Sequence, residues 1–308
     1  MLVQIVMATY NGSKFIKQQI DSIIAQSFSD WELLVHDDGS TDDTVNIIKD
    51  YVQKDSRVKL LDDGLKFHSS TANFIHLLKN ADKSADYICL CDQDDVWSEK
   101  KLEILLSEIE KTGKKNEVPV CLSTDVSLID SEGRKYIESF WQYAHVFTKS
   151  DFKTLVLENT ATGCTMIFNR KTLDYVSLLS DSEISNIIQH DWYIALVCAA
   201  DGIYKQIEVP LVGYRQHNEN EVGARKTNVF EKLNPKKCRE SLARIAKLKK
   251  RIFQQLFVVE NHINDVGCMK KAKKFRKSKM ILHKSFILTN GFCKSKSIPK
   301  SIIKLFCY

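Results

Sequence analysis

The 308-residue sequence has little of what marks disordered, fibrous or membrane-spanning chains. It contains only 4 prolines and 11 glycines, which argues against long linkers and low-complexity segments. No apolar run approaches the ~20 residues that span a bilayer, and no repeat recurs at the spacing of a solenoid. The layout of a signal peptide is also missing, because an expected strand begins at residue 2. We therefore expect a cytoplasmic protein with one large domain and a smaller appendage.

Cysteines are present but lack any pattern that links them. The chain has 9, and no two of them form a CxxC pair or stand near histidines at the spacing of a zinc site. They lie singly among apolar residues, at positions 89, 91, 121, 164, 198, 238, 268, 293 and 307. Buried free thiols in a reducing compartment are the expected state, rather than disulfides.

Charge is distributed unevenly along the chain. Residues 226–308 hold 22 Lys and Arg against 4 Asp and Glu, whereas residues 1–225 hold 23 against 35. The sequence thus predicts an acidic domain over residues 1–225 and a basic helical region over residues 226–308, with the boundary near residues 225–230. The basic run at 270–279 leaves three interpretations open: a solvated helix face, a contact with anionic lipid at the inner face of the plasma membrane, and nucleic-acid binding. Aromatic platforms and nucleic-acid-binding motifs are missing, so we expect no nucleic-acid partner.

Apolar runs alternate with helical patterns through the first half of the chain. This βαβαβ order predicts an α/β fold, with a Rossmann-like, mostly parallel sheet flanked by helices. Residues 123–160 show no regular period. Strands are expected at residues 2–7, 31–35, 58–61, 87–91, 119–122, 165–168, 203–208 and 212–214. Ligands of such sheets bind beyond the carboxyl ends of the strands, where several acidic residues of this chain fall.

The most informative of these acids form the run Asp92-Gln93-Asp94-Asp95, directly after a nearly continuous apolar strand. In extended backbone Asp92 and Asp94 project to one side and Asp95 to the other. Two carboxylates on one side suit Mg²⁺ or Mn²⁺, ions that bind through one or two carboxylates together with substrate phosphates. The run therefore predicts a nucleoside diphosphate ligand. The alternative is an acidic loop that caps the helix beginning near Ser98.

Asp37 and Asp38 end another expected strand, where a carboxylate can accept a hydrogen bond from a nucleobase. Ordinary turn formation explains the pair equally well. Residues 41–43 stand at a helix start, where acids and hydroxyls satisfy free N–H groups, so a structural role is expected for them.

Two further groups are candidates for the chemistry. Asp191 opens a helix and is either an N-cap or, if it faces the acidic cleft, a general base for an acceptor hydroxyl. Arg215 and His217 follow the last strand and suit a diphosphate, Arg through its forked donors and His as a donor or metal ligand. A polar strand end is the alternative for that pair.

Three motifs, taken together, resemble glycosyltransferase family 2, the inverting group with the GT-A fold. They are Ala8-Thr9-Tyr10-Asn11-Gly12, Asp37-Asp38-Gly39-Ser40 and Asp92-Gln93-Asp94-Asp95, and the resemblance covers about residues 1–220. The continuation to Val96-Trp97 and the late Tyr214-Arg215-Gln216-His217 look like bacterial rhamnosyltransferases of surface polysaccharide assembly.

The resemblance implies transfer of a sugar from a dTDP- or UDP-sugar to a glycan or polyprenyl-linked acceptor, with Mg²⁺ or Mn²⁺. Asp191 stands where the family has its catalytic base, and His190 replaces the usual preceding Glu. The implied metal pair is Asp92 and Asp94. The implied nucleotide-sugar ligands are Thr9, Tyr10, Asn11, Asp38, Asp92, Arg215 and His217.

Two other classes stay open on the residues alone. A nucleotidyltransferase also uses a metal-bound aspartate pair on an α/β sheet, and it would release pyrophosphate. A non-catalytic sugar-nucleotide-binding protein would keep Asp38 and Asp92 but would have no need of Asp191.

Overall fold

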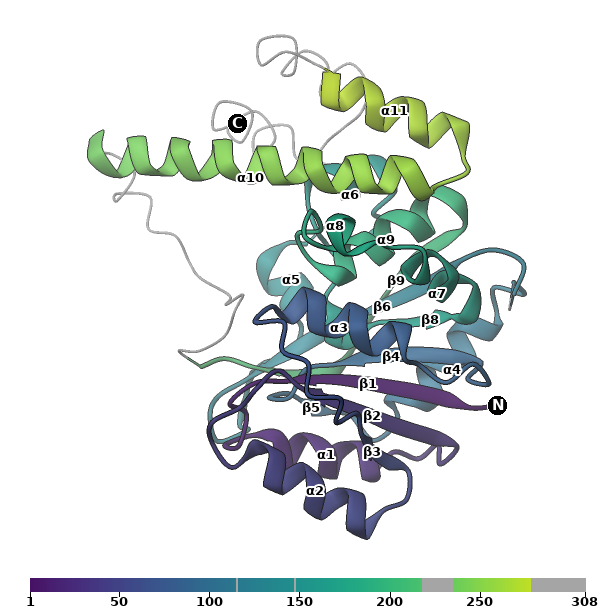
Figure 1. Ribbon diagram of the computed structural model, residues 1–308, viewed down its shortest axis with the longest axis vertical. Coiled ribbons are helices and arrows are strands. Elements are labelled where there is room, and N and C mark those ends of the chain that lie inside the picture. The colour runs from purple at the N-terminus through teal and green to yellow at the C-terminus, as the bar shows by residue number, and fades with distance from the viewer. Residues whose placement is uncertain (115, 147, 218–234, 278–308) are drawn as a thin grey trace.

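The computed structural model describes residues 1–114, 116–146, 148–217 and 235–277 (Figure 1). Its N-terminal half alternates strands and helices as the sequence predicts. The elements of this half are β1 (Val3–Thr9), α1 (Ile16–Ile24), β2 (Trp31–Asp37), α2 (Thr44–Lys54), β3 (Val58–Leu60), α3 (Ser70–Lys79), β4 (Tyr87–Cys91), β5 (Val96–Trp97) and α4 (Lys101–Glu110).

The second half adds strands to the same sheet and helices to one of its faces. Its elements are β6 (Val120–Ile129), β7 (Lys135–Ile137), α5 (Phe140–Ala144), α6 (Phe152–Leu157), the 3₁₀ turn η1 (Gly163–Thr165), β8 (Ile167–Asn169), α7 (Arg170–Ser177), α8 (Asp181–Ile184), α9 (His190–Asp201), β9 (Ile203–Arg215), α10 (Pro235–His262) and α11 (Val266–Lys277).

The strands form one sheet in the order β3-β2-β1-β4-β8-β6-β9-β5, with β7 paired to β6. The predicted parallel arrangement is confirmed for β3, β2, β1 and β4. From β8 onward the sheet is mixed, because β8 runs antiparallel to both of its neighbours while β6 and β9 pair in parallel. The molecule thus has a Rossmann-like half joined to a mixed half, and the carboxyl ends of β1, β2 and β4 meet at one edge.

Alternation along the buried strands supplies a core on each face of the sheet. Val3, Ile5 and Met7 pack with α1, α2 and α4 on one face. Val6 lies on the other face, with α3, α6, α7 and α9. These two layers of helices enclose the sheet from both sides, as Figure 1 shows.

Strands β6 and β9 are longer than the sequence predicts. The expected strand at 119–122 continues to Ile129, and the two expected strands at 203–208 and 212–214 form one strand from Ile203 to Arg215. The two strands pair along their lengths, with register shifts on either side of Asp125. This pairing buries polar residues of β6, so the second half of the strand has no alternation of apolar and polar residues by which it could be predicted.

Helices α10 and α11 pack on the body of the molecule. Leu256, Val259 and Ile263 of α10, with Ala272 and Phe275 of α11, join the apolar cluster that contains α6 and α9. The described part of the basic region forms two helices, and these apolar side chains of α10 and α11 share the core of the N-terminal body. The expected boundary near residues 225–230 lies outside the described residues.

The six cysteines whose side chains are described (Cys89, Cys91, Cys121, Cys164, Cys198 and Cys268) are free and buried, as predicted. Among the helices that the structure describes, none combines the length and apolar character needed to cross a bilayer.

Candidate active site

A pocket of about 760 Å³ opens at the carboxyl ends of β1, β2 and β4, a size within the usual range for a small-ligand site. Six of the residues singled out from the sequence line it: Thr9, Tyr10, Asp38, Asp92, Asp94 and Asp191. Three others, Asn11, Arg215 and His217, stand beside the lining rather than in it. The structure thus brings together residues that lie up to 182 positions apart in the sequence.

The loop after β1 is fastened to the loop after β2. Thr9 Oγ1 donates to Asp37 Oδ1 at 2.9 Å, and Asp37 Oδ2 accepts the backbone N–H groups of Gly39 and Ser40. Asn11 has a positive φ of 48°, and its side-chain oxygen accepts the N–H of Thr41 at 2.8 Å. Asp37 and Asn11 therefore shape the turns, and Asp38 is the acid of this pair that lines the pocket.

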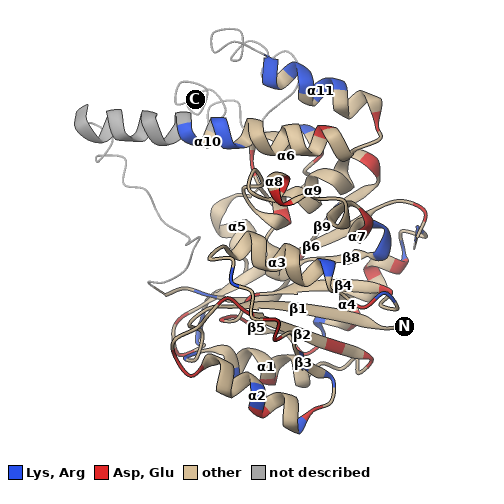
Figure 2. Ribbon diagram, viewed as in Figure 1, with Lys and Arg blue, Asp and Glu red and all other residues tan. Residues whose placement is uncertain are grey.

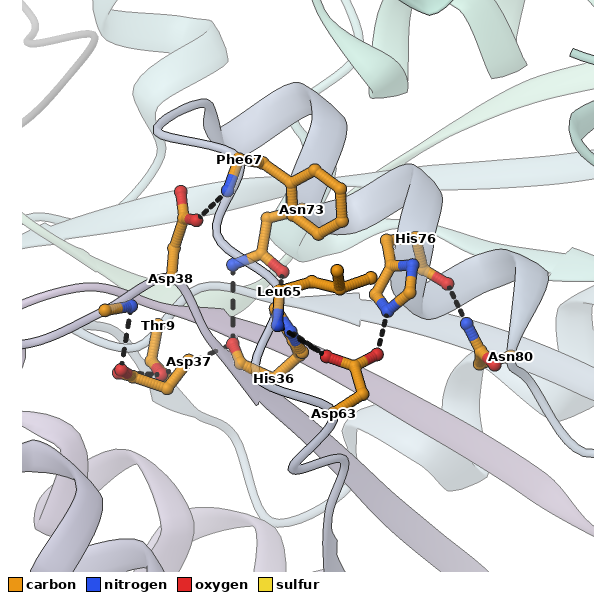
Figure 3. Close-up of polar contacts among 11 residues, drawn as sticks. Thr9, His36, Asp37, Asp38, Asp63, Leu65, Phe67, Asn73, His76 and Asn80 are labelled. Carbon is orange, nitrogen blue, oxygen red and sulfur yellow. Dashed lines mark hydrogen bonds and ion pairs between the residues drawn. The ribbon is translucent and has the colours of Figure 1, made fainter. Parts of the chain in front are cut away.

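Asp38 is buried and holds the segment between β3 and α3. Its carboxylate accepts the backbone N–H of Phe67 (Figure 3). It also accepts the backbone N–H of Ser69, at 3.0 Å. A carboxylate with two N–H donors is fixed in place, and its remaining lone pairs are available to a ligand. Asp38 thus couples the position of residues 61–69 to the wall of the pocket.

Gln93 fastens the acidic run to the first loop. Its amide donates to the carbonyl of Tyr10 and accepts the N–H of Tyr10, both at 2.9 Å. A Cβ on Gly12 would lie 2.2 Å from Gln93 Oε1, so only glycine leaves room for this contact. Tyr10 itself is 53% exposed and projects at the pocket mouth.

Asp94 and Asp95 point to different surroundings, as the alternation of side chains along an extended backbone predicts. Asp94 lines the pocket and its carboxylate meets His217 Nε2 at 2.8 Å, while Asp95 is fully buried. However, one oxygen each of Asp92 and Asp95 and the Cys164 sulfur lie within 4.8 Å of one another. The second carboxylate brought close to Asp92 in this group is therefore Asp95, which the sequence suggested would turn away.

Asp95 lies in an unusual environment for a carboxylate. Its Oδ1 accepts the N–H of Arg215 at 3.0 Å, and within the described part of the chain its Oδ2 has no hydrogen-bond partner. Burial, followed by the charge of Asp94, raises the pKa of Asp95 above the ordinary carboxyl range. The Lys101 ammonium is also buried, donates to the carbonyl of Cys164 at 2.6 Å and lies over the Trp97 ring. This cation offsets part of the negative charge below the pocket.

Arg215 does not have the free guanidinium that diphosphate binding requires. Its side chain donates to the carbonyls of Asp94, Asp130 and Ser131 at 2.7–3.0 Å and to Gln18 at 2.5 Å, and the residue is fully buried. The donors expected for a phosphate are directed at backbone carbonyls. Arg215 therefore fixes the backbone at Asp94, a correction to its expected contact with the ligand.

Asp191 is not the N-cap of its helix, because α9 has Gln189 at that position. The Asp191 carboxylate accepts Gly163 N–H at 3.0 Å, Asn159 Nδ2 at 3.0 Å and Trp192 N–H at 2.6 Å. The side chain is buried and lines the same pocket as Asp92 and Asp94. Three donors fix the orientation of this carboxylate.

His190 also lines the pocket, at 8% exposure, and stacks on Phe74 with ring centroids 4.0 Å apart. Neither ring nitrogen has a hydrogen-bond partner among the residues that the structure describes. Burial lowers the pKa of His190 to about 3, so the ring is neutral near pH 7. A neutral imidazole with a free donor and a free acceptor is suited to a hydroxyl group of a ligand.

Comparison with known proteins identifies the family. The sequence model described as "Glycosyl transferase family 2" matches residues 4–176, more than half of the chain. The chain belongs to glycosyltransferase family 2. A dTDP-rhamnosyl transferase, RfbG of Shigella flexneri, is 31% identical over 224 residues, which cover 71% of this glycosyltransferase and 74% of the relative.

Solved structures agree on the fold. TarS of S. aureus (residues 1–349, in complex with UDP) superposes with a TM-score of 0.57 at 15% identity, over 97% of this chain and 77% of that one. The mannosyltransferase PcManGT of Pyrobaculum calidifontis, in complex with GDP-Man and Mn²⁺, gives 0.53 at 13% identity, over 99% and 78%. Membership of the family makes the protein a glycosyltransferase and sets aside the nucleotidyltransferase and the non-catalytic binding protein.

Several residues of this glycosyltransferase site carried no assignment from the sequence. Lys101 resembles an ordinary helix-start lysine, and Gln93 is hidden between stronger aspartate signals. His190 was noted only as a replacement for Glu. The roles of Lys101 and Gln93 depend on contacts with residues more than 60 positions away in the sequence, which no local pattern reveals. For His190, its place directly before Asp191 was a usable signal.

Proposed function

We propose that the enzyme transfers a sugar, with rhamnose as the first candidate, from a nucleoside diphosphate donor with inversion at the anomeric carbon. The observation that carries this proposal is the meeting of Asp38, Asp92, Asp94 and Asp191 in one pocket. The rhamnose donor is supported by the likeness to a dTDP-rhamnosyl transferase over most of both chains. The acceptor is a hydroxyl of a glycan or of a polyprenyl-linked saccharide.

Asp191 is the proposed general base. Its carboxylate is held by three N–H donors on the pocket wall, so an acceptor hydroxyl bound in the pocket meets a fixed acceptor of its proton. A positioned base typically contributes ~10²–10⁴-fold to the rate. The acceptor oxygen then bonds to the anomeric carbon as the bond to the nucleoside diphosphate breaks.

Asp92 and Asp94 are the proposed ligands of Mg²⁺ or Mn²⁺. The donor set fits a hard ion, since carboxylate oxygens line the pocket and the buried Asp95 Oδ2 beside Asp92 has no partner. When bound, the ion neutralises charge on the departing diphosphate. His217 holds Asp94 through its Nε2 and is assigned a positioning role there.

Thr9, Tyr10 and Asp38 are the proposed contacts of the nucleotide, with Asp38 on the base. Asn11 supports them by holding the two loops together. Arg215 is proposed to act on the donor only through the Asp94 backbone. His190, with two free ring nitrogens in the pocket, is proposed to bind a sugar hydroxyl.

A membrane surface is the proposed setting for the acceptor. Helix α11 buries Cys268, Ala272 and Phe275 against the body and exposes lysines on its other side. Figure 2 shows Lys and Arg concentrated along α11, with a separate group on the part of α10 that precedes residue 252. The exposed lysines of α11 are Lys270, Lys271, Lys273, Lys274 and Lys277. Such a face suits anionic lipid and thereby a lipid-linked acceptor.

The donor is tested with a panel of sugar nucleotides: dTDP-rhamnose, UDP-glucose, UDP-galactose and UDP-N-acetylhexosamines. Nucleoside diphosphate release is measured with Mg²⁺ or Mn²⁺ and with a chelator. We expect dTDP-rhamnose to give the highest rate and the chelator to remove it. A preference for another sugar nucleotide would contradict the proposal of a rhamnose donor. A rate that the chelator does not change would contradict the proposed metal dependence.

Asp191→Asn tests the base. We expect donor binding to change less than threefold and transfer to fall at least 100-fold, because the amide keeps the shape but cannot take the proton. Asp174→Asn is the matched control, since that carboxylate is exposed and forms an ion pair with the exposed Lys171. Near-normal transfer by Asp191→Asn would refute the assignment.

A further inference from the structure

A second group of potential metal ligands lies beside β2, apart from the Asp92–Asp94 pair. His36 of β2, His76 of α3 and Asp63 of the segment between β3 and α3 each have a ligand atom within 4.8 Å of the others. Asp63 Oδ2 is 2.7 Å from His76 Nε2, and Asp63 Oδ1 is 3.3 Å from His36 Nε2 (Figure 3). The two imidazole rings lie 5.0 Å apart at 66°.

The hydrogen bonds around His36 decide which ring nitrogen carries its proton. The Asn73 amide donates to the backbone carbonyl of His36 at 3.3 Å, so its oxygen is the atom that faces His36 Nδ1 at 2.6 Å. An amide oxygen only accepts, which requires the proton on Nδ1. In the neutral ring His36 Nε2 is then an acceptor, and it faces a carboxylate oxygen.

Two acceptors this close need either a proton or a metal ion between them. His36 is 1% exposed, so water does not solvate the ring freely. The opposite ring nitrogen donates to Asn73 Oδ1, which is the support that metal-bound histidines commonly have. Two ligands of a tetrahedral zinc, each at about 2.0–2.1 Å from the ion, lie about 3.3 Å apart. The 3.3 Å between His36 Nε2 and Asp63 Oδ1 matches that span, and the 2.7 Å hydrogen bond between His76 Nε2 and Asp63 Oδ2 would have to open by about 0.6 Å for an ion to take its place.

We propose that His36, Asp63 and His76 form a site for a zinc-like divalent ion that fastens the 61–69 segment to the sheet. Two imidazoles and one carboxylate favour zinc over the hard ions suited to Asp92 and Asp94. The arrangement leaves one position of a tetrahedral ion for water. The three protein ligands come from a strand, a helix and the segment between them.

The site also bears on the donor pocket. The segment that supplies Asp63 also supplies the backbone N–H of Phe67 to Asp38 (Figure 3), and that of Ser69. His36 and Asp38 stand two positions apart at the end of β2. An ion at this site therefore orders the N–H donors that hold Asp38, a consequence that rests on the proposed role of Asp38 toward the nucleotide.

The test is a zinc titration of the full chain, stripped of metal, without nucleotide or magnesium. Calorimetry and metal analysis are expected to give about one bound equivalent, with amides 65–69 gaining protection from hydrogen exchange. His76→Gln and Asp63→Asn are expected to weaken binding at least tenfold. Each variant is also made on Asp92→Asn, so that the first metal pair does not contribute.

Asp62→Asn is the matched control, because this neighbouring carboxylate faces Lys49 and no histidine. It should bind zinc like the unchanged chain. Equal binding by His76→Gln, or no binding by the unchanged chain at micromolar zinc, would overturn the proposal; in the second case a proton alone bridges His36 and Asp63. Because no nucleotide is present, neither failure bears on the proposed transfer reaction.

Discussion

His190 is a neutral imidazole stacked on Phe74, and its burial makes the free energy of unfolding decrease in acid. Its pKa of about 3 in the folded chain lies below the ordinary 6.5, so the unfolded chain binds the proton first. Stability from this residue is therefore complete above pH 6.5 and falls as the pH drops toward 3. The slope is about 1.4 kcal/mol per pH unit at most.

His190→Phe should keep the stack on Phe74 and remove that slope. Between pH 6.5 and 5 we expect the free energy of unfolding of the variant to fall by roughly 1–2 kcal/mol less than that of the unchanged enzyme. Its kcat/KM should fall roughly tenfold through loss of the proposed hydrogen bond between His190 and the sugar. Denaturant unfolding at several pH values checks the first, and a parallel pH dependence in both proteins would contradict it.

Gly12 permits the contact between Gln93 and Tyr10. Gly12→Ala should displace the Gln93 amide, break its two hydrogen bonds and destabilise the fold by roughly 1–2 kcal/mol. The effect depends on the partner, so Gly12→Ala should cost much less in a Gln93→Ala background. A double-mutant cycle by denaturant unfolding measures this coupling. Additive effects would show that Gly12 acts through something other than Gln93.

At the scale of elements, α8 and α10 are joined by an acid-sensitive contact. Glu183 accepts the N–H and hydroxyl of Ser180 and meets His262 Nε2 at 3.0 Å. Burial alone would raise the pKa of Glu183, but these hydrogen bonds outweigh it and lower the pKa to about 2. The contribution is complete above the ordinary pKa of about 4.5 and is lost as the pH falls toward 2.

Glu183→Gln should therefore destabilise the protein at pH 7, by roughly 3 kcal/mol at most, and flatten the loss of stability between pH 5 and 3. Thermal unfolding across that range measures the difference. Asp181→Asn on the same helix is the control and should retain the unchanged profile. If both variants behave alike, the acid sensitivity of the α8–α10 contact has another source.

The sequence predicted the Rossmann-like half well because its strands are buried on both faces and its helices are amphipathic. The second half of β6 was not predicted because Ser123, Thr124 and Asp125 are polar although they are buried. Their hydrogen-bond partners, such as Thr165 and Trp141, are distant in the sequence. The same limit applies to the site. Side chains at strand ends were found by type and spacing, whereas Arg215 needed the structure, since only its contacts reveal that its donors point at carbonyls.

At the scale of the whole molecule, the exposed lysines of α11 are expected to determine binding to anionic surfaces. Each contributes about 1 kcal/mol near such a membrane. Changing Lys270, Lys273 and Lys277 to Gln should weaken sedimentation with vesicles of phosphatidylglycerol and phosphatidylcholine at least tenfold, and raised salt should weaken the unchanged enzyme similarly.

The matched control changes Lys49, Lys54 and Lys83, three exposed lysines outside α10 and α11. It removes the same charge and should leave vesicle binding nearly intact. An equal loss of vesicle binding in both triple variants would indicate attraction by net charge alone. No loss in either variant would contradict the proposal that α11 binds a membrane.

The packing of α10 and α11 on α6 and α9 also bears on how such enzymes change over evolution. Leu256, Val259, Ile263 and Phe275 are buried against the catalytic body, so removal of the basic region uncovers part of its core. A lineage that adapts to a new acceptor cannot discard these helices as a detachable module. It can, however, exchange the exposed lysines one at a time, so the surface is free to diverge while the helices beneath it are inherited with the active site.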